Sequence, residues 1–358
     1  MTQFCRHLSN ALAINNLGGD FTVSPCCYFS HNESVHDLST LPQLREKWNS
    51  GDLTKTCSLC IHQEQQKQIS YRQAGFDLMT DSDGLQMLTI AVTKQCNLAC
   101  ASCDSNSSSF WQDENIRNGV ENTKVLDRKG TNTDDKLVSW FETLDTTNLR
   151  YIKFGGGEPL MNNTHLRILE LVNNPQDITI QYTSNYTLYP SDKTLAQWQR
   201  FKLVKWIGSI DGVGKQFEYL RWPAKFSTVE KLVNKAIEEC PGNVMFGIEH
   251  TLNPFNVFYY DKIKEWYKDA MLTNRFGDPS DFNIHPCHGT IGIEKTPTAL
   301  RKKIKERYGS EHEISIMLNQ YPYTEHKSAI NWANTLDKWR NLQWDTTFHE
   351  ITKYFNSH

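Results

Sequence analysis

From residue 85 onward, short runs of β-branched and apolar residues alternate with longer stretches of helical periodicity. This alternation is typical of βα units on a parallel sheet, because each strand needs a crossover before the next parallel strand. We expect strands over residues 87–94, 150–155, 177–184, 203–210, 243–251 and 281–287, and helices over residues 164–173, 193–201, 227–239 and 259–270. The sequence therefore predicts a large parallel α/β domain.

Two further regions flank this predicted domain. Residues 1–78 are rich in cysteine and form the predicted small N-terminal module, residues 79–290 form the α/β core, and residues 291–358 form a C-terminal helical region packed on the core. Helices are expected over 297–308 and 328–343, with an apolar stripe of Trp332, Trp339 and Trp344. The polar segment 104–135 is rich in Ser, Asn and Asp, so we predict a long loop there, with room for a poorly defined helix.

Composition gives no support for several classes of partner. The 358-residue chain has a formal net charge of −3, so no basic field favours nucleic acid or an anionic membrane. Its apolar runs fall short of the roughly 18 to 20 residues that span a bilayer, and the N-terminal residues lack the pattern of a signal peptide. We therefore expect a cytoplasmic protein, in which clustered cysteines bind metal or take part in catalysis.

Cys96, Cys100 and Cys103 follow the first predicted strand of the α/β domain with the spacing C-x3-C-x2-C. Three thiolates on one loop can hold three irons of a cubane cluster and leave the fourth iron open for a substrate. On a helix the same three positions would share one face, where small buried cysteines pack well. The spacing alone leaves both interpretations open.

This motif resembles the cluster-binding motif of the radical S-adenosylmethionine (SAM) superfamily, and the resemblance spans most of the chain. It implies a partial (β/α)6 barrel with Cys96, Cys100 and Cys103 as ligands of a catalytic 4Fe-4S cluster. In that family the reduced cluster cleaves bound SAM to methionine and a 5′-deoxyadenosyl radical. The family usually has an aromatic residue just before the third cysteine, where this chain has Ser102.

Further motifs at strand ends match the SAM-binding motifs of the same family. Glycines let a backbone approach a ligand closely, although a tight turn needs them as well. The resemblance implies that SAM is bound by Gly156, Gly157 and Glu158 of the run GGGEP, and by Ser209, Asp211 and Arg221 near the fourth strand. A turn with a surface arginine is the alternative for the second group.

Other residues at predicted strand ends are less specific. His250, His285 and Cys287 would face the same barrel mouth, where active sites of such barrels lie, but each also suits ordinary packing. We assign no role to Cys240, which precedes a Pro-Gly pair at a helix end.

The N-terminal cysteines form a second group. Cys5, the Cys26 that follows Pro25, and the C-x2-C pair Cys57 and Cys60 supply four thiolates, which suit either a 4Fe-4S cluster or structural zinc. The pattern resembles the SPASM/twitch auxiliary-cluster module, placed here before the barrel. The resemblance implies an auxiliary 4Fe-4S cluster, with Cys26 favoured over Cys27. Zinc and the absence of a metal stay open.

Taken together, the residues and the resemblance predict a radical SAM oxidoreductase or maturase that abstracts hydrogen from a peptide or protein side chain. Such an enzyme would need a low-potential electron donor such as flavodoxin or ferredoxin. One alternative is a radical SAM enzyme for a small molecule such as a sugar, nucleotide or cofactor precursor. An alternative of another class is a zinc-binding scaffold without catalysis.

Overall fold

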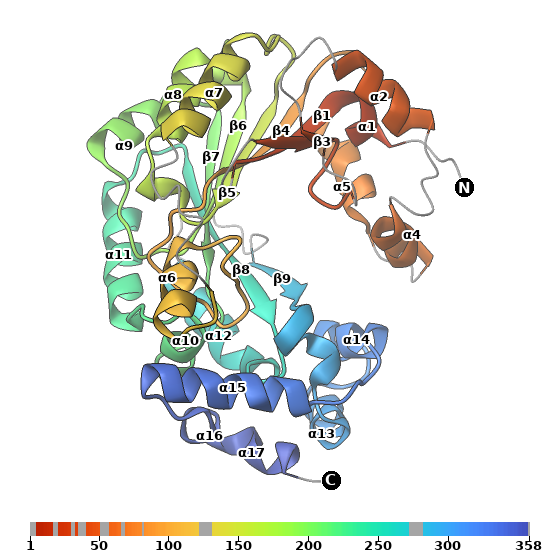
Figure 1. The fold of residues 1–358 in the computed structure, drawn as a ribbon, viewed down its shortest axis with the longest axis vertical. Coiled ribbons are helices and arrows are strands. Elements are labelled where there is room, and N and C mark those ends of the chain that lie inside the picture. Colours follow the sequence, from red (N-terminus) through yellow and green to blue (C-terminus); the bar gives the residue numbers. More distant parts are fainter. Residues whose placement is uncertain are drawn as a thin grey trace.

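A computed structural model describes residues 5–16, 21–29, 33–34, 41–50, 57–65, 69–80, 82–121, 131–271 and 282–356. Its centre is one nine-stranded sheet with the order β3-β2-β1-β4-β5-β6-β7-β8-β9 (Figure 1). The strands are β1 (Ala11–Asn15), β2 (Thr22–Ser24), β3 (Glu33–Ser34), β4 (Met87–Thr93), β5 (Tyr151–Gly156), β6 (Thr179–Ser184), β7 (Leu203–Ser209), β8 (Val244–Leu252) and β9 (Phe282–Pro286).

Strands β4 to β9 are parallel and lie side by side in chain order, as in a partial (β/α)6 barrel. Each of the six predicted strands agrees with the observed strand to within two residues at both ends. Residue 281, where the last predicted strand begins, lies outside the described residues. The Nζ of Lys153 on β5 lies 3.2 Å from Oε1 of Glu249 on β8. In a flat sheet those strands would be about 14 Å apart, so the pair reflects a concave face.

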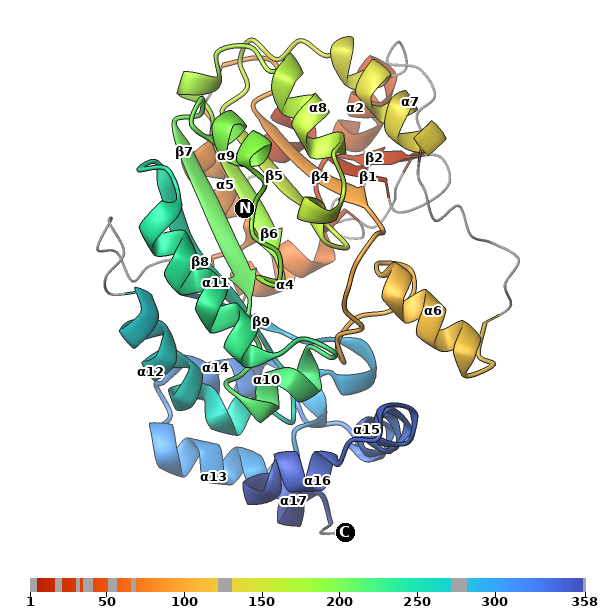
Figure 2. The same ribbon diagram turned by 90° about the vertical axis from the view of Figure 1, so that its left-hand side faces the viewer.

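Helices cover the convex face of the sheet (Figure 2). Buried aromatic rings from neighbouring strands and helices pack beneath them: the ring centroids of Tyr182 and Trp198 are 5.0 Å apart, and those of Trp198 and Trp206 are 5.6 Å apart. The helices of this region are α6 (Ser109–Arg117), α7 (Thr131–Glu142), α8 (Thr164–Leu171), α9 (Asp192–Trp198), α10 (Lys215–Leu220), α11 (Phe226–Glu239) and α12 (Tyr260–Met271). Short 3-10 turns lie at η2 (Pro159–Met161), η3 (Pro175–Asp177) and η4 (Val257–Tyr259).

Segment 104–135 is more ordered than the predicted loop with a poorly defined helix, because it contains α6 and the start of α7. Ser108 caps α6 by accepting a hydrogen bond from the backbone N–H of Trp111. Trp111 and Glu114 of α6 are buried, so tertiary packing stabilises a helix whose sequence is otherwise polar. Residues 122–130 of this segment lie outside the described residues.

The N-terminal region continues the barrel sheet instead of forming a sheet of its own. β1 pairs in parallel with β4, from Ala11 opposite Met87 to Asn15 opposite Ala91, and β2 and β3 follow in antiparallel order. One sheet therefore contains strands from both sides of the predicted domain boundary at residue 78. The boundary itself stays a prediction. The helices here are α1 (Arg6–Asn10), α2 (Leu41–Ser50), α4 (Ser58–Gln65) and α5 (Tyr71–Leu78).

The C-terminal region is helical, as the sequence predicts, and lies at the opposite end of the molecule from β1 (Figure 1). Its elements are η6 (Gly289–Ile291), η7 (Ile293–Lys295), α13 (Thr298–Tyr308), α14 (Glu313–Gln320), α15 (Lys327–Arg340), α16 (Trp344–Thr347) and α17 (His349–Phe355). Trp344 is buried and Trp332 and Trp339 pack against the core. Among the helices that the structure describes, none has the length and apolar character needed to cross a bilayer.

Candidate functional site

The three clustered cysteines lie on the loop that leaves the carboxyl end of β4, and this loop is not helical. The helix-face interpretation of their spacing is therefore wrong. The loop docks on the segment after α10, because Ala99 N–H donates to the Trp222 carbonyl at 2.8 Å and Ala101 N–H donates to the Leu220 carbonyl at 2.7 Å. These bonds satisfy the loop backbone without regular secondary structure.

The three thiols lie close enough to influence one another. Burial raises the pKa of Cys96 and of Cys103 to about 12, and in each case the neighbouring Cys100 thiolate raises it further. Burial also raises the pKa of Cys100, against the pull of the Arg221 guanidinium. Three buried neighbouring thiols that resist ionisation need positive charge to become thiolates, and an iron-sulfur cluster supplies it. The donor set therefore fits such a cluster.

Single-ion coordination has no comparable support. Within the described ranges, no three His, Cys, Asp or Glu side chains converge as the ligands of one metal ion do. In a cubane cluster each thiolate binds a different iron, so its cysteines need not converge on one point.

The glycine run at the end of β5 packs directly on the start of the cysteine loop. A β-carbon on Gly156 would lie 2.5 Å from the Thr93 carbonyl oxygen, and one on Gly157 would lie 2.3 Å from that of Gln95. Gly156 also has a φ of 117°, which other residues rarely adopt. A β-carbon on Gly155, in contrast, would meet none of the described atoms within 4 Å, so space remains beside it.

Glu158 ties the ends of β5 and β6 together. Its buried carboxylate accepts hydrogen bonds from the backbone N–H of Asn185 at 2.7 Å and of Leu160 at 3.2 Å. Burial raises the pKa of this carboxyl to about 7. The Asn185 side-chain amide then donates to Oδ1 of Asn97 at 2.8 Å, which connects this corner to the cysteine loop.

Asp211 and Arg221 meet behind Cys100. The Nε of Arg221 lies 2.6 Å from Oδ2 of Asp211, and Nη1 of Arg221 donates to Sγ of Cys100 at 3.7 Å. The other Asp211 oxygen accepts the Thr251 N–H at 2.8 Å. Ser209 is half-buried at the end of β7. The structure therefore brings Asp211 and Arg221, two of the predicted SAM contacts, to the cysteine loop. There the two side chains form an ion pair with each other.

Residues 90–259 match the family model described as the Radical SAM superfamily. This part of the chain is therefore similar to radical SAM domains. The cysteine triplet, the GGGEP run and Arg221 all lie within it, whereas the N-terminal cysteines and α15 lie outside it. No curated protein matches the chain.

The chain is also similar to several solved structures, including two that contain bound S-adenosylmethionine. One is native anSMEcpe with bound AdoMet, at 15% identity and a TM-score of 0.42, covering 67% of this chain and 63% of that chain. Another is Streptococcus suis SuiB bound to S-adenosylmethionine, at 15% identity and a TM-score of 0.38, covering 78% and 51%. A third is TYW1 with a lysine-pyruvate adduct bound, at 11% identity and a TM-score of 0.34, covering 62% and 71%. This chain thus spans less than two thirds of the first of these proteins.

Outside the segment that matches the radical SAM model, the N-terminal cysteines gather from three separate segments. Burial raises the pKa of Cys5 to about 11, and nearby Cys57 and Cys60 raise it further. Burial also raises the pKa of Cys26, with added contributions from Cys27, Cys5 and Cys60. Cys27 is an exposed residue, and its thiol interacts with the Lys153 charge and the Tyr71 hydroxyl, so the thiol faces the barrel.

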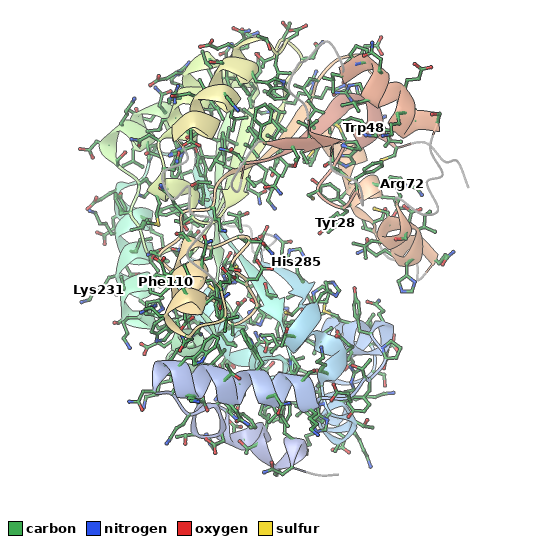
Figure 3. The ribbon with its side chains drawn as sticks, viewed as in Figure 1. Tyr28, Trp48, Arg72, Phe110, Lys231 and His285 are labelled. Carbon is green, nitrogen blue, oxygen red and sulfur yellow. The ribbon has the colours of Figure 1, made fainter. Side chains whose placement is uncertain are left out.

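The less specific candidates occupy varied positions. His250 is buried and its Nδ1–H donates to the Ile210 carbonyl at 2.8 Å, which is a structural role. Cys287 and Cys240 are buried, with the Cys287 thiol 3.5 Å from the His288 carbonyl oxygen. His285 is exposed on β9 and lies on the side of the barrel that faces Tyr28 of the N-terminal region (Figure 3).

A polar group on the concave face of the barrel was not predicted. Besides the Lys153–Glu249 pair, Nε2 of Gln181 donates to Oε1 of Glu249 at 3.4 Å, and the Tyr151 hydroxyl donates to Oε1 of Gln181. His285 and Tyr28 also lie within electrostatic range of Glu249. A sequence signal exists: parallel strands are usually apolar on both faces, yet polar residues alternate with buried ones along β5 and β6.

Proposed function

We propose that this protein is a radical SAM enzyme that abstracts hydrogen from a peptide or protein side chain. The observation that carries the proposal is the non-helical loop at the end of β4, which groups Cys96, Cys100 and Cys103 inside the segment that matches the radical SAM model. These thiolates would hold a 4Fe-4S cluster, which supplies the electron that cleaves SAM. The protein would receive that electron from a donor such as flavodoxin or ferredoxin.

The proposed SAM-binding residues come from the ends of β5 and β7 and from the segments that follow these strands. The backbone of Gly156 and Gly157 passes the start of the cysteine loop, and the open space beside Gly155 gives a ligand room. Glu158 would act by holding this corner in shape, since its carboxylate is already occupied by two backbone amides. Ser209, Asp211 and Arg221 would complete the site, with the Arg221 guanidinium between Asp211 and Cys100.

An auxiliary 4Fe-4S cluster on Cys5, Cys26, Cys57 and Cys60 is the second part of the proposal. Support comes from the mutual electrostatic influence of these thiols, although they come from three segments. Cys27 faces Lys153 and Tyr71 instead, which supports Cys26 as the ligand. Such a cluster would accept or relay an electron from the substrate radical.

The concave face supports a polar substrate. Lys153, Gln181 and Glu249 present a cation, an amide and a carboxylate from three strands of the barrel. A peptide offers matching amide and side-chain groups, whereas an apolar substrate would remove these groups from water without offering them new hydrogen bonds. A small polar molecule is the alternative, and deuterium transfer from labelled candidates into 5′-deoxyadenosine would distinguish the two.

The central experiment measures 5′-deoxyadenosine formed from SAM by the anaerobically reconstituted protein with dithionite. Cys96→Ala is expected to abolish product formation. Cys240→Ala is the matched control, because it also removes a buried thiol but lies away from both cysteine groups. Full activity in Cys96→Ala would refute the catalytic cluster. Stoichiometric zinc with negligible iron in the wild-type protein would instead support the scaffold alternative.

Iron and sulfide analysis tests the auxiliary cluster separately. Cys60→Ala is expected to lose one cluster's content of iron while it keeps SAM cleavage, because the catalytic cysteines are unchanged. Cys27→Ala should keep the wild-type iron content. Equal iron in the wild type and Cys60→Ala would contradict the auxiliary cluster and leave the catalytic one standing.

A further inference from the structure

Helix α15 contacts the cysteine loop directly, although it lies outside the segment that matches the radical SAM model. The indole N–H of Trp332 donates to the carbonyl of Ala101 at 3.1 Å, across a separation of 231 residues. Ala101 lies between two of the three clustered cysteines, so a C-terminal side chain holds the middle of the loop.

A second indole holds the neighbouring carbonyl. Trp111 of α6 donates its N–H to the Cys100 carbonyl at 2.8 Å. The rings of Trp111 and Trp332 stack, with centroids 5.4 Å apart and planes 21° apart. Two stacked indoles therefore bind two successive carbonyls of the cysteine loop, and each ring limits the movement of the other.

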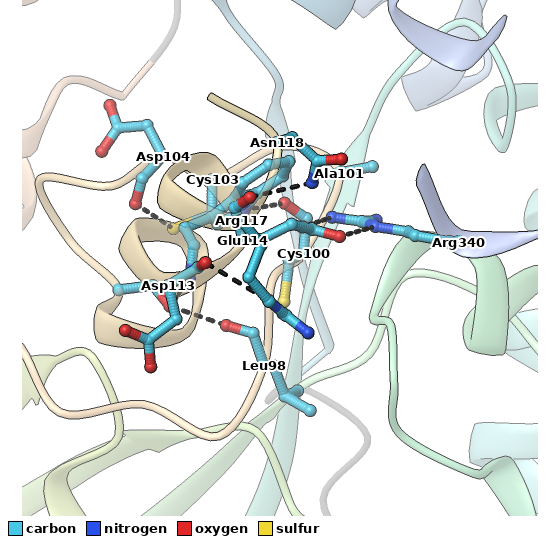
Figure 4. Close-up of polar contacts among 12 residues, drawn as sticks. Leu98, Cys100, Ala101, Cys103, Asp104, Asp113, Glu114, Arg117, Asn118 and Arg340 are labelled. Atoms are coloured by element: carbon cyan, nitrogen blue, oxygen red, sulfur yellow. Dashed lines mark hydrogen bonds and ion pairs between the residues drawn. The ribbon is translucent and has the colours of Figure 1, made fainter. Parts of the chain in front are cut away.

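Arg340, at the end of α15, pairs with Glu114 of α6 beside the cysteine loop (Figure 4). Its Nε and Nη2 donate to the Glu114 carboxylate at 2.9 and 2.6 Å, and the two side chains are 0% and 4% exposed. The guanidinium also lies 4.7 Å from the Trp111 ring and 4.9 Å from the Trp222 ring. The Trp222 carbonyl in turn accepts a hydrogen bond from the Ala99 N–H. Arg340 therefore packs against two tryptophans that each hydrogen-bond to the cysteine loop.

We propose that Trp332 and Arg340 are positioning residues for the catalytic cluster, which makes α15 a required part of the cluster site. The inference rests on the proposed function, because it needs a cluster on the cysteine loop. A rigid cubane requires its thiolates at fixed positions, and this loop has no regular secondary structure to fix them. The indole bonds also direct the Cys100 and Ala101 carbonyls, and local dipoles of this kind influence the potential of an iron-sulfur cluster.

Trp332→Phe is the principal test, because it removes the N–H and keeps an aromatic ring in the stack. We expect its reconstituted catalytic cluster to lose iron to a chelator about 10-fold faster or more, in line with the loss of other outer contacts to metal ligands. We also expect an altered midpoint potential and an altered response of the reduced-cluster EPR spectrum to SAM. Trp344→Phe is the matched control, since its indole donates to Asn334 in the same helical layer.

Arg340→Lys is the second test, because it keeps the charge but cannot form the two parallel bonds to Glu114. It should shift the same EPR response, whereas Lys338→Met, at an exposed position on the same helix, should not. The melting temperature of each cluster-free variant shows whether it folds. A variant that folds but keeps the wild-type chelation rate, potential and EPR response to SAM would overturn the inference.

The outcomes separate this inference from the proposed function. Cys96→Ala gives the baseline for iron held only by the N-terminal cysteines. If the wild-type protein shows no SAM-responsive cluster above that baseline, the proposed function fails. If it does and Trp332→Phe and Arg340→Lys behave in the same way as the wild type, only the role of α15 fails.

Discussion

The buried pair of Arg340 and Glu114 allows a quantitative test of how α15 is attached to the barrel. The pair is bidentate, with both side chains almost fully removed from solvent. Arg340→Met leaves the Glu114 carboxylate buried without its partner, and Glu114→Leu leaves the guanidinium in the same position. Breaking a buried pair in this way costs about 3–5 kcal/mol of unfolding free energy.

The double variant Arg340→Met/Glu114→Leu should recover most of that loss. An apolar pair of similar volume leaves no uncompensated charge, and such replacements are often close to neutral. The cation–π contacts with Trp111 and Trp222 are lost in both Arg340 variants, which leaves a residual cost of about 1–2 kcal/mol. The coupling energy between the two positions should then be about 3 kcal/mol or more, in favour of the pair.

Anaerobic urea unfolding of the wild type and the three variants, followed by tryptophan fluorescence, measures this cycle. The differences should persist in about 0.5 M salt, because buried charges are poorly screened. Additive losses within about 0.5 kcal/mol would refute the reasoning, since they would mean that the two charges do not depend on one another.

Three further predictions use other parts of the barrel. Lys153→Met should cost about 1 kcal/mol or less in urea unfolding, because the Lys153 side chain is 31% exposed; a loss as large as that of Arg340→Met would contradict the dependence on burial. Gly208→Ala should lower the melting temperature, at a cost of about 1–3 kcal/mol, because its β-carbon would lie 2.4 Å from the Tyr186 ring. Gly242→Ala should keep the wild-type melting temperature, because its β-carbon would meet no described atom within 4 Å. Equal melting temperatures for Gly208→Ala and Gly242→Ala would count against the packing around Tyr186. Burial raises the Glu158 pKa from 4.5 to about 7, so its contribution to stability is present below pH 4.5 and is lost as the pH rises through 7. We therefore expect the melting temperature of the wild type to fall more between about pH 5 and about pH 8 than that of Glu158→Gln. Parallel curves of melting temperature against pH for the two proteins would contradict this.

Local sequence patterns predicted the six barrel strands well, because each is a short apolar run bounded by polar residues. The same patterns missed β1, whose five residues become a strand through parallel pairing with β4, more than seventy residues later. They allowed only a poorly defined helix where α6 forms, because α6 depends on the burial of Trp111 and Glu114 against distant residues. Pairing and burial of this kind leave no periodic signal in the segment itself.

By itself, the sequence indicated the chemistry that we propose for the cysteine loop. Cys96, Cys100 and Cys103 lie within eight residues, so their spacing already restricts them to one small site. Only the tertiary structure decided which distant groups meet there and nearby: Arg221 beside Cys100, Lys153 opposite Glu249, and Trp332 on the Ala101 carbonyl. The physical reason is that these contacts depend on the curvature of the sheet and on how α15 packs against α6, and neither is set by spacing along the chain.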